Sequence, residues 1–278
     1  MDLAAKAAEW NQIQADLTLR IVPTDKLDFT TPAFPPQSGF VQSAQLVGGH
    51  ARKTAEAQTT FGPELRYIAG LDVSFFEGTD EAIGCIVVME APSLKIVYAD
   101  YQTVMLDLPY IPSYLAFRES PVLLALLHKL KQDRSDLYPQ IIMIDGNGAL
   151  HPRMCGLACH VGVLADVPSI GVGKNFLQID GEGLTMKKVK ELAKMHLTDA
   201  GKWFPLVGTS GKVYGAALRP TKGAPNPIFV SRGHRVSLET AVELVAWCCR
   251  YRVPEPIRAA DLTSREVVKR TLRERGGK

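Results

Sequence analysis

The chain has 278 residues, of which 46% are hydrophobic and 22% charged, a composition typical of a folded globular protein. Its formal net charge of +3 permits a polyanionic partner without requiring one. No stretch approaches the roughly 20 apolar residues of a membrane span, the start lacks a secretory signal pattern, and five cysteines in apolar contexts argue against a disulfide framework.

The first half of the chain predicts a helix, a loop and an antiparallel meander. Residues 3–21 have helical periodicity, with an apolar stripe formed by Trp10, Ile13 and Leu17. Residues 23–55 are rich in Pro, Thr, Ser and Gly, so we assign residues 1–22 to an N-terminal helix and 23–55 to an insert or loop. Three strand patterns joined by short turns then cover residues 66–75, 82–90 and 95–105.

The next stretch predicts a β-α-β unit. A helix is expected from Glu119 to about Leu130, with Pro121 in its first turn. The apolar strand 140–145 reads as buried on both faces, and a helix at 156–164 and a strand at 168–172 follow it. A meander followed by this unit indicates an α/β fold with a mixed sheet flanked by helices.

The last third has weaker signals. We expect a lysine-rich helix capped by Thr185, a strand pair, an apolar helix and a final helix that starts near Pro256. These elements cover residues 185–197, 213–219 with 227–231, 238–251 and 256 onward. Residues 56–264 are assigned to one domain and 265–278 to a basic tail.

Four acids stand where a fold could bring them together: Asp72, Glu119, Asp145 and Asp261. Asp72 closes an apolar run, and Asp145 closes another directly before a glycine loop. A carboxylate at the end of a buried strand is costly unless it holds a metal ion or moves a proton. Any one of these acids could be a turn residue or helix cap, but two on adjacent buried strands favour a site for divalent metal ions.

Further candidates flank these acids. The loop Gly146-Asn147-Gly148 lets backbone approach a base or phosphate, and His151 could donate to a phosphate or cap a tight turn. Lys174 ends a strand and could stabilise charge on a phosphate, although its surroundings lack the spacing of a nucleotide-binding loop. The stiff loop Pro109-Tyr110-Ile111-Pro112 could split a base stack, or its Tyr could pack on a neighbouring loop.

Other charged or metal-binding patterns are less specific. Cys155, Cys159 and His160 lie in an apolar helix without a second ligand pair, so we reject a zinc site. Two basic groups could follow a phosphate backbone or form solvated helix faces. They are Lys187, Lys188, Lys190 and Lys194, and Arg265, Lys269, Arg270, Arg273 and Arg275.

Together these motifs resemble the endonuclease V family over most of residues 66–265. The stretches that carry the resemblance are 68–74, 109–112, 117–119, 145–148, 151–153, 156–160, 171–174, 233–238 and 254–261. The resemblance implies an RNase H-like fold and a Mg²⁺-dependent endonuclease, with Mn²⁺ as a substitute. Such an enzyme cuts the second phosphodiester 3′ to hypoxanthine, leaving 3′-hydroxyl and 5′-phosphate ends.

The resemblance also implies roles for individual residues. Asp72, Glu119, Asp145 and Asp261 would be catalytic and hold the metal, and Lys174 and His151 would be catalytic beside them. Tyr110 would be the wedge, in a substrate-binding set with Pro109, Ile111, Pro112, Arg118 and His234. The backbone of Gly146, Gly148, Gly156 and Leu157 would line the slot for the flipped base.

The form of the motifs resembles the eukaryotic branch, which acts on inosine in single-stranded RNA. We therefore expect an endoribonuclease, with a DNA repair nuclease for deoxyinosine as the alternative and a non-catalytic reader of inosine RNA as a third possibility. We further expect a monomer with no membrane partner, located in the cytoplasm, with the nucleus or nucleolus as the alternative.

Overall fold

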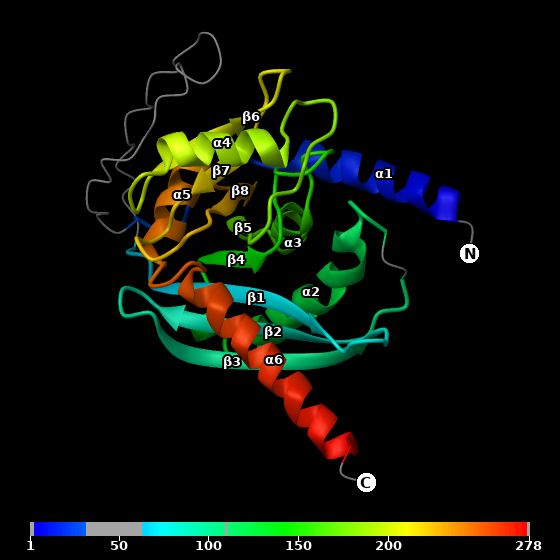
Figure 1. Cartoon of the computed structure of the whole chain (residues 1–278). Helices are drawn as coiled ribbons and strands as arrows, with labels where there is room; N and C mark the ends of the chain where they lie inside the picture. The colour runs from blue at the N-terminus through cyan, green and yellow to red at the C-terminus, as the bar shows by residue number, and fades with distance from the viewer. Residues whose placement is uncertain (1–2, 32–62, 109–110, 277–278) are drawn as a thin grey trace.

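The computed structural model describes residues 3–31, 63–108 and 111–276, and it contains one mixed eight-stranded sheet between helical layers (Figure 1). The strand order is β3-β2-β1-β4-β5-β8-β7-β6. The strands are β1 (Tyr67–Phe75), β2 (Glu81–Glu90), β3 (Lys95–Met105), β4 (Ile141–Asp145), β5 (Ser169–Gly173), β6 (Trp203–Val207), β7 (Val213–Leu218) and β8 (Ile228–His234). This confirms the predicted α/β mixed sheet of RNase H-like type.

The sheet joins an antiparallel meander to a parallel centre. β1, β2 and β3 pair antiparallel, whereas β4 lies parallel to both β1 and β5. β8, β7 and β6 extend the other side antiparallel. The meander and the β-α-β unit were predicted, but β6 was not, because its Pro205 and short apolar run give little strand signal.

Helices cover both faces of the sheet. α5 (Leu238–Trp247) and α6 (Glu255–Gly276) contribute to one core with Ile68 of β1. α2 (Leu115–Asp133) and α3 (Leu157–Ala165) cover the opposite face, and α4 (Met186–His196) covers the β6–β8 part of that same face. α1 (Leu3–Arg20) packs outside α3, and the short η2 (Ser135–Leu137) precedes β4.

Three predicted helices need correction. α1 buries Trp10, Leu17 and, unexpectedly, Gln14, which is fully buried, while Ile13 is 36% exposed. α2 starts four residues earlier than predicted, and Pro121 lies inside the helix. The predicted start was too late because proline is preferred in the first turn of a helix. α5 ends at Trp247 rather than at residue 251.

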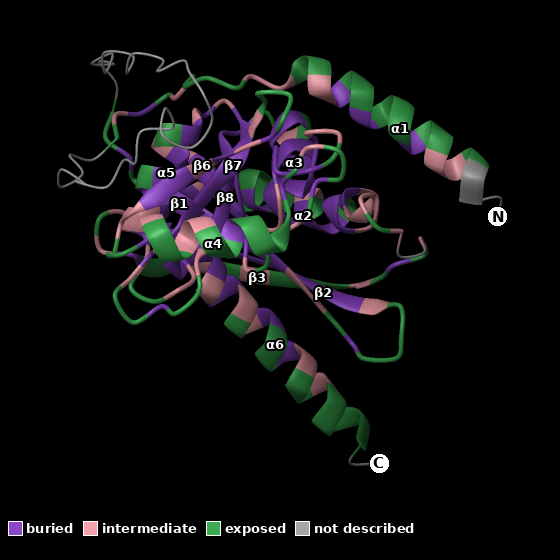
Figure 2. Ribbon diagram, turned by 45° about the horizontal axis from the view of Figure 1, so that its top comes forward, coloured by how far each residue is buried: buried purple, intermediate pink, exposed green. Residues whose placement is uncertain are grey.

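The final helix is continuous across the boundary expected at residue 264. α6 runs from Glu255 to Gly276, and its buried residues end at Val267, so the basic tail is the second half of this helix. Figure 2 shows α6 becoming exposed toward its end as it projects beyond the sheet. Residues 32–55 of the predicted insert, and residues 56–62 after it, lie outside the described residues. Of the helices in the described part, none is long and apolar enough to cross a membrane.

Candidate active site

The centre of the candidate site is built by the parallel pair β1 and β4. Leu71 lies opposite Ile144 in the register, so Asp72 and Asp145 follow side by side at the strand ends. Both acids stand on the face that Ile68 and Met143 use for the core under α6, because alternate residues of a strand share a face. The predicted adjacency of the two acid-bearing strands is therefore present.

A glycine brings the third acid to this point. A side chain on Gly70 would collide with the carbonyl of Pro256, so α6 can begin in direct backbone contact with β1 only because this residue is glycine. Little more than one turn later, α6 places Asp261 above Asp72. Carboxylate oxygens of Asp72, Asp145 and Asp261 all lie within 4.8 Å of one another.

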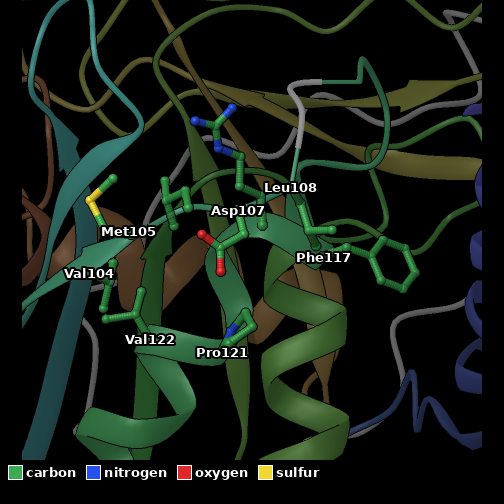
Figure 3. A pocket seen from close by; sticks show the side chains of 9 residues that line it. Val104, Met105, Asp107, Leu108, Phe117, Pro121 and Val122 are labelled. Atoms are coloured by element: carbon green, nitrogen blue, oxygen red, sulfur yellow. The ribbon is translucent and has the colours of Figure 1, made fainter. Parts of the chain in front are cut away.

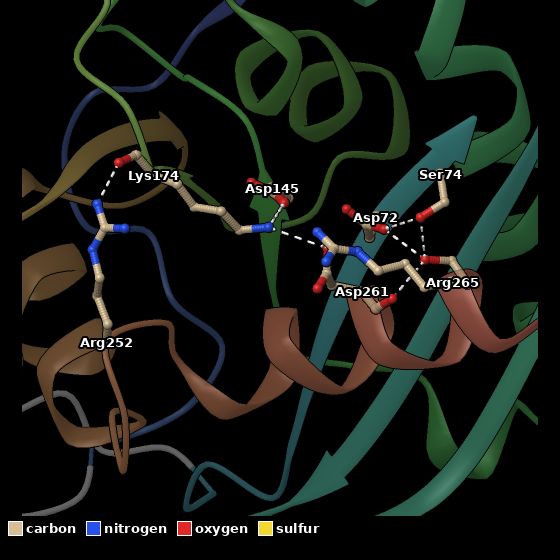
Figure 4. Close-up of polar contacts among 8 residues, drawn as sticks. Asp72, Ser74, Asp145, Lys174, Arg252, Asp261 and Arg265 are labelled. Carbon is tan, nitrogen blue, oxygen red and sulfur yellow. Dashed lines mark hydrogen bonds and ion pairs between the residues drawn. The ribbon is translucent and has the colours of Figure 1, made fainter. Parts of the chain in front are cut away.

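The three carboxylates are neutralised only in part (Figure 4). Lys174 Nζ lies 2.6 Å from Asp145 Oδ2 and 3.2 Å from Asp261 Oδ1, and Arg265 Nη2 lies 2.9 Å from Asp261 Oδ1. Two cations against three acids leave the cluster net negative. Hard carboxylate oxygens in a partly buried, negative cluster suit Mg²⁺, so the donor set fits the predicted metal.

Burial and hydroxyl groups act in opposite directions on Asp72. Burial raises the pKa of Asp72 to about 6, the Ser264 hydroxyl opposes this shift, and the charges of Asp145 and Asp261 add to it. Ser264 Oγ donates to Asp72 Oδ2 over 2.7 Å, and Ser74 Oγ donates to the same oxygen over 3.3 Å. The two hydroxyls fix the orientation of this carboxylate.

Glu119 approaches from the other helical layer. It is buried on α2 and does not belong to the group of three acids within 4.8 Å. Burial raises the pKa of Glu119 to about 8, with further contributions from the charges of Asp72 and Asp145. A carboxyl group with this pKa is mostly protonated at neutral pH, so a bound cation would lower the free energy of its ionised form.

Arg118 is turned toward a different feature. Its guanidinium pairs with Asp80 at 2.9 Å and lines a hollow of about 230 Å³ between the end of β3 and α2 (Figure 3). The hollow is mainly apolar, and Phe117 and Pro121 form part of its wall. Arg118 therefore faces Asp80 and this hollow, and its contact with the substrate stays a prediction.

The glycine loop is packed tightly against the sheet. Side chains at Gly148 and Gly156 would collide with the carbonyls of Arg232 and Asn147, respectively. The Gly148 amide donates to Ser231 Oγ over 2.8 Å, and the Gly156 amide donates to the Gly148 carbonyl over 3.0 Å. Gly146 has φ of +152°, a conformation that favours glycine. These glycines are thus required by the protein's own backbone packing, and both amides are already engaged.

His151 belongs to a network around the carbonyl of Ser113. His151 Nε2 lies 2.9 Å from this oxygen, Arg153 Nη2 donates to it over 2.7 Å, and Gln14 Nε2 donates over 3.5 Å. His151 Nδ1 accepts from the Arg153 amide, so Nε2 carries the proton in the neutral ring. Burial lowers the pKa of His151 to about 4. A neutral ring with both nitrogens engaged lacks the free nitrogen that a proton carrier needs.

We call this network the Ser113 clamp; it consists of Gln14, Ser113, His151 and Arg153. Arg153 Nε also donates to Gln14 Oε1, and Gln14 Nε2 donates to the Cys155 carbonyl over 3.0 Å. The clamp joins α1, the loop after the glycines and the residue that follows Ile111-Pro112. Pro109 and Tyr110, the first half of the predicted wedge, lie outside the described residues.

His234 lies at the opposite end of β5 from Lys174 and the acids. It pairs with Ser169 at the start of β5, whereas Lys174 follows the end of that strand, five residues and roughly 16 Å further along. Its ring is buried between Asp166 and the Val22 amide, both at 3.3 Å. His234 therefore holds the segment after α1, and its contact with the substrate stays a prediction.

Several residues of the site carried no clear signal in the sequence. Ser264 and Gln14 contact residues far away in the chain and lie on helices with other polar residues. Cys155 and Cys159, the cysteines of the zinc pattern rejected above, are buried and lie outside disulfides. Within the described ranges, the group of Asp72, Asp145 and Asp261 is the one cluster that could hold a metal ion.

The comparisons with known proteins agree with this geometry. A family model described as endonuclease V matches residues 50–262. Endonuclease V of Mus musculus is 48% identical over 214 residues, which are 76% of this chain and 62% of the mouse protein. The match therefore spans less than two thirds of that relative's length.

Solved structures extend the likeness to the fold. The catalytic domain of human endonuclease V has a TM-score of 0.79 and 37% identity, covering 96% of this chain and 98% of that one. Ciona intestinalis endonuclease V, solved in complex with a 23mer DNA containing an inosine followed by a ribo-adenosine, has a TM-score of 0.79 and 32% identity, covering 98% and 99%. The motifs, the family model and these structures coincide, and the chain belongs to the endonuclease V family.

Proposed function

We propose that this chain is a divalent-metal-dependent endonuclease that cuts strands containing inosine at the second phosphodiester on the 3′ side. The observation that carries the proposal is the convergence of Asp72, Asp145 and Asp261 within 4.8 Å, with Lys174 bound to two of them. Carboxylates that repel one another are costly in a protein that only binds a strand, so this cluster favours catalysis over a purely binding role.

The acids would hold the metal, and the lysine would act on the substrate. Asp72, Asp145 and Asp261 are the ligands, with Glu119 as a fourth carboxylate close by; Mg²⁺ is the proposed ion, with Mn²⁺ as a substitute. Bound there, the ion would polarise the phosphate and lower the pKa of a water molecule. Lys174 would be released from its acid partners and would stabilise the negative charge that develops on the phosphate. Ser264 and Ser74 keep Asp72 oriented.

The flipped base would enter a slot beside the glycine loop and the first turn of α3. A side chain at Gly146 would touch Leu157, so glycine here keeps this side of the slot open. Hypoxanthine lacks the 2-amino group of guanine and offers O6 and N1–H, unlike adenine. A slot that leaves a 2-amino group without space or partner therefore selects against guanine. Tyr110, with Ile111 and Pro112, would fill the gap that the base leaves.

RNA is the proposed substrate rather than DNA. The Ciona intestinalis relative was crystallised with a ribo-adenosine placed directly after the inosine. A cut at the second phosphodiester falls on the 3′ side of that nucleotide, so its 2′-hydroxyl would lie next to the scissile phosphate. A 2′-hydroxyl at this position is the group by which a protein can distinguish RNA from DNA.

One cleavage assay tests the proposal. Single-stranded RNA with one inosine, the same strand with adenosine, and the matched DNA are incubated with and without Mg²⁺, and the ends are mapped. We expect a cut at the second phosphodiester only in the inosine RNA with Mg²⁺, leaving a 5′-phosphate. Preferential cutting of the DNA would instead favour a DNA repair nuclease. Tight binding without cutting at any Mg²⁺ concentration would indicate a reader.

A further inference from the structure

A row of basic side chains leads away from the acid cluster along α6. Arg265, Lys269 and Arg273 follow Asp261 at intervals of four residues, and all three are exposed. Four residues turn a helix by about 400° and advance it by about 6 Å. The three side chains therefore share an arc of about 80° and extend about 18 Å beyond Asp261. We call Arg265, Lys269 and Arg273 the basic ridge.

The ridge starts inside the candidate site and ends in solvent. Arg265 contacts Asp261 at 2.9 Å while its side chain is 59% exposed, so it belongs both to the cluster and to the surface (Figure 4). Lys269 and Arg273 have no ion-pair partner among the residues that the structure describes. Two unpaired cations in line with a cationic residue at the site form a positive path toward it.

Other basic residues of α6 attach the helix to the meander. Arg270 donates to the Tyr101 hydroxyl over 2.7 Å, and Arg275 binds both carboxylate oxygens of Glu81 over 2.6 and 2.8 Å. Val267 packs with Phe76 and Ile83 at the turn between β1 and β2. These contacts hold the second half of α6 on the meander, so the ridge is presented by an anchored helix and its free charges are directed outward.

The position of the ridge defines which part of a strand it could meet. The glycine loop and the Ser113 clamp lie toward β4 and β5, whereas α6 continues toward β2 and β3 through Tyr101 and Glu81. The acid cluster stands between them. If the flipped base lies on the β4–β5 side and the cut falls 3′ to it, the strand beyond the cut runs toward α6.

We propose that the basic ridge binds the sugar-phosphate backbone of the nucleic-acid strand on the 3′ side of the cut. This rests on the proposed function and adds to it a second contact region outside the active site. Contacts between basic side chains and phosphates are independent of sequence, weaken with salt and fix the register of a strand. The ridge would therefore hold the 3′ product segment and align the scissile phosphate.

Binding of strands of different length tests the ridge. Affinity is measured for inosine RNA that ends two nucleotides after the cut, for RNA extended by ten nucleotides on the 3′ side, and for RNA extended equally on the 5′ side. Asp145→Asn is the common background, which prevents cutting. The test variant is Lys269→Ala/Arg273→Ala. The charge-matched control is Lys95→Ala/Lys131→Ala. Lys95 opens β3 at the end away from Tyr101, and Lys131 lies in the last turn of α2, on the other face of the sheet from α6.

The ridge predicts a loss confined to the 3′-extended strand. Each lost phosphate contact on a single strand reduces the salt slope by about 0.7, so the double variant should lower the slope by about 1.4. The gap between the affinities of background and variant should then shrink about sevenfold between 50 and 200 mM salt. The control should match the background on all strands.

Three results would overturn the ridge: equal affinity of variant and background for the 3′-extended strand, an equal loss on all strands, or an unchanged salt slope. The proposed function is checked separately by cutting of inosine RNA with the otherwise unchanged protein. If that protein cuts but the ridge variants bind normally, only the ridge is refuted. If it never cuts inosine strands, the function itself fails.

Discussion

The acid cluster and the Ser113 clamp both contain buried polar groups, but they differ in how far those groups are paired. In the cluster, three carboxylates face two cations, and burial raises the pKa of Asp72 to about 6. In the clamp, one carbonyl receives donors from three side chains, and Gln14, although fully buried, both donates and accepts. The acid cluster has more negative than positive charge, whereas the polar groups of the clamp are hydrogen-bonded to one another.

Because of this difference, we expect the two regions to have different roles. A site with surplus negative charge is favourable only when a cation binds, so it is suited to recruit one. A satisfied buried network gains stability from rigidity and loses it when one member is removed, because the partners are left unpaired. We therefore expect the cluster to control chemistry with little effect on folding, and the clamp to control the geometry of the loop that carries Ile111 and Pro112.

The largest effect should come from Asp145→Asn. Removing one metal ligand forfeits several kcal/mol of transition-state stabilisation, which is a loss of cutting of about 10³-fold or more. Stability without metal should stay equal or rise, since one repelling charge is gone. The control is Asp100→Asn. Asp100 is a partly buried acid on β3 that pairs with Lys129 of α2, and this variant should cut normally. Cutting by Asp145→Asn within tenfold of wild type would contradict the cluster's role.

The second-largest effect should be a loss of stability at acidic pH, caused by His151 of the clamp. The neutral His151 has a pKa of about 4 in the fold and about 6.5 when unfolded, so the unfolded chain takes up the proton first. Its contribution to stability is complete above pH 6.5 and declines by about 3 kcal/mol as the pH falls to 4. Urea unfolding from pH 7 to pH 4 should show this decline in wild type relative to His151→Gln. Parallel pH profiles of the two proteins would refute it.

The acid cluster could be predicted from the sequence better than the Ser113 clamp, for physical reasons. Asp72 and Asp145 stand out because a carboxylate that ends a wholly apolar strand breaks a strong pattern. The clamp depends on Gln14, which looks like any polar residue of an exposed helix face, and on a contact with Cys155 that lies 141 positions away. The burial of Gln14 rather than Ile13 is decided by tertiary packing, which helical periodicity does not encode. His234 shows the converse, since a motif match gave it a site role, whereas the register of β5 places it at the opposite end of that strand from Lys174.

A smaller effect is expected from Ser264→Ala. Loss of the 2.7 Å hydrogen bond frees the Asp72 carboxylate, and removing such support of a metal ligand typically costs 10- to 100-fold in metal affinity or activity. The concentration of Mg²⁺ at half-maximal cutting measures the change. Ser93→Ala, which removes a hydroxyl bound to the Glu90 carbonyl in the β2–β3 turn, is the control. An unchanged Mg²⁺ dependence would mean that Ser264 does not support the site.

The smallest effect should come from Gln14→Ala. The clamp then loses hydrogen bonds worth about 1 kcal/mol each, so the loop after Pro112 loosens and binding of inosine RNA weakens by roughly tenfold. The maximal cutting rate should change less than the KM, because the acids are untouched. Gln12→Ala, an exposed residue two positions earlier on α1, should behave like wild type. A fall in kcat with an unchanged KM would place the clamp in the chemistry instead.

Anomalous diffraction from crystals grown with Mn²⁺ and an inosine RNA shows whether Asp72, Asp145 and Asp261 hold the catalytic cation. We expect a manganese peak bounded by these three carboxylates, with Lys174 Nζ displaced from Asp145, and no peak at this position in Asp145→Asn crystals. If the protein cuts with Mn²⁺ but the ion lies elsewhere, these three carboxylates are not its ligands.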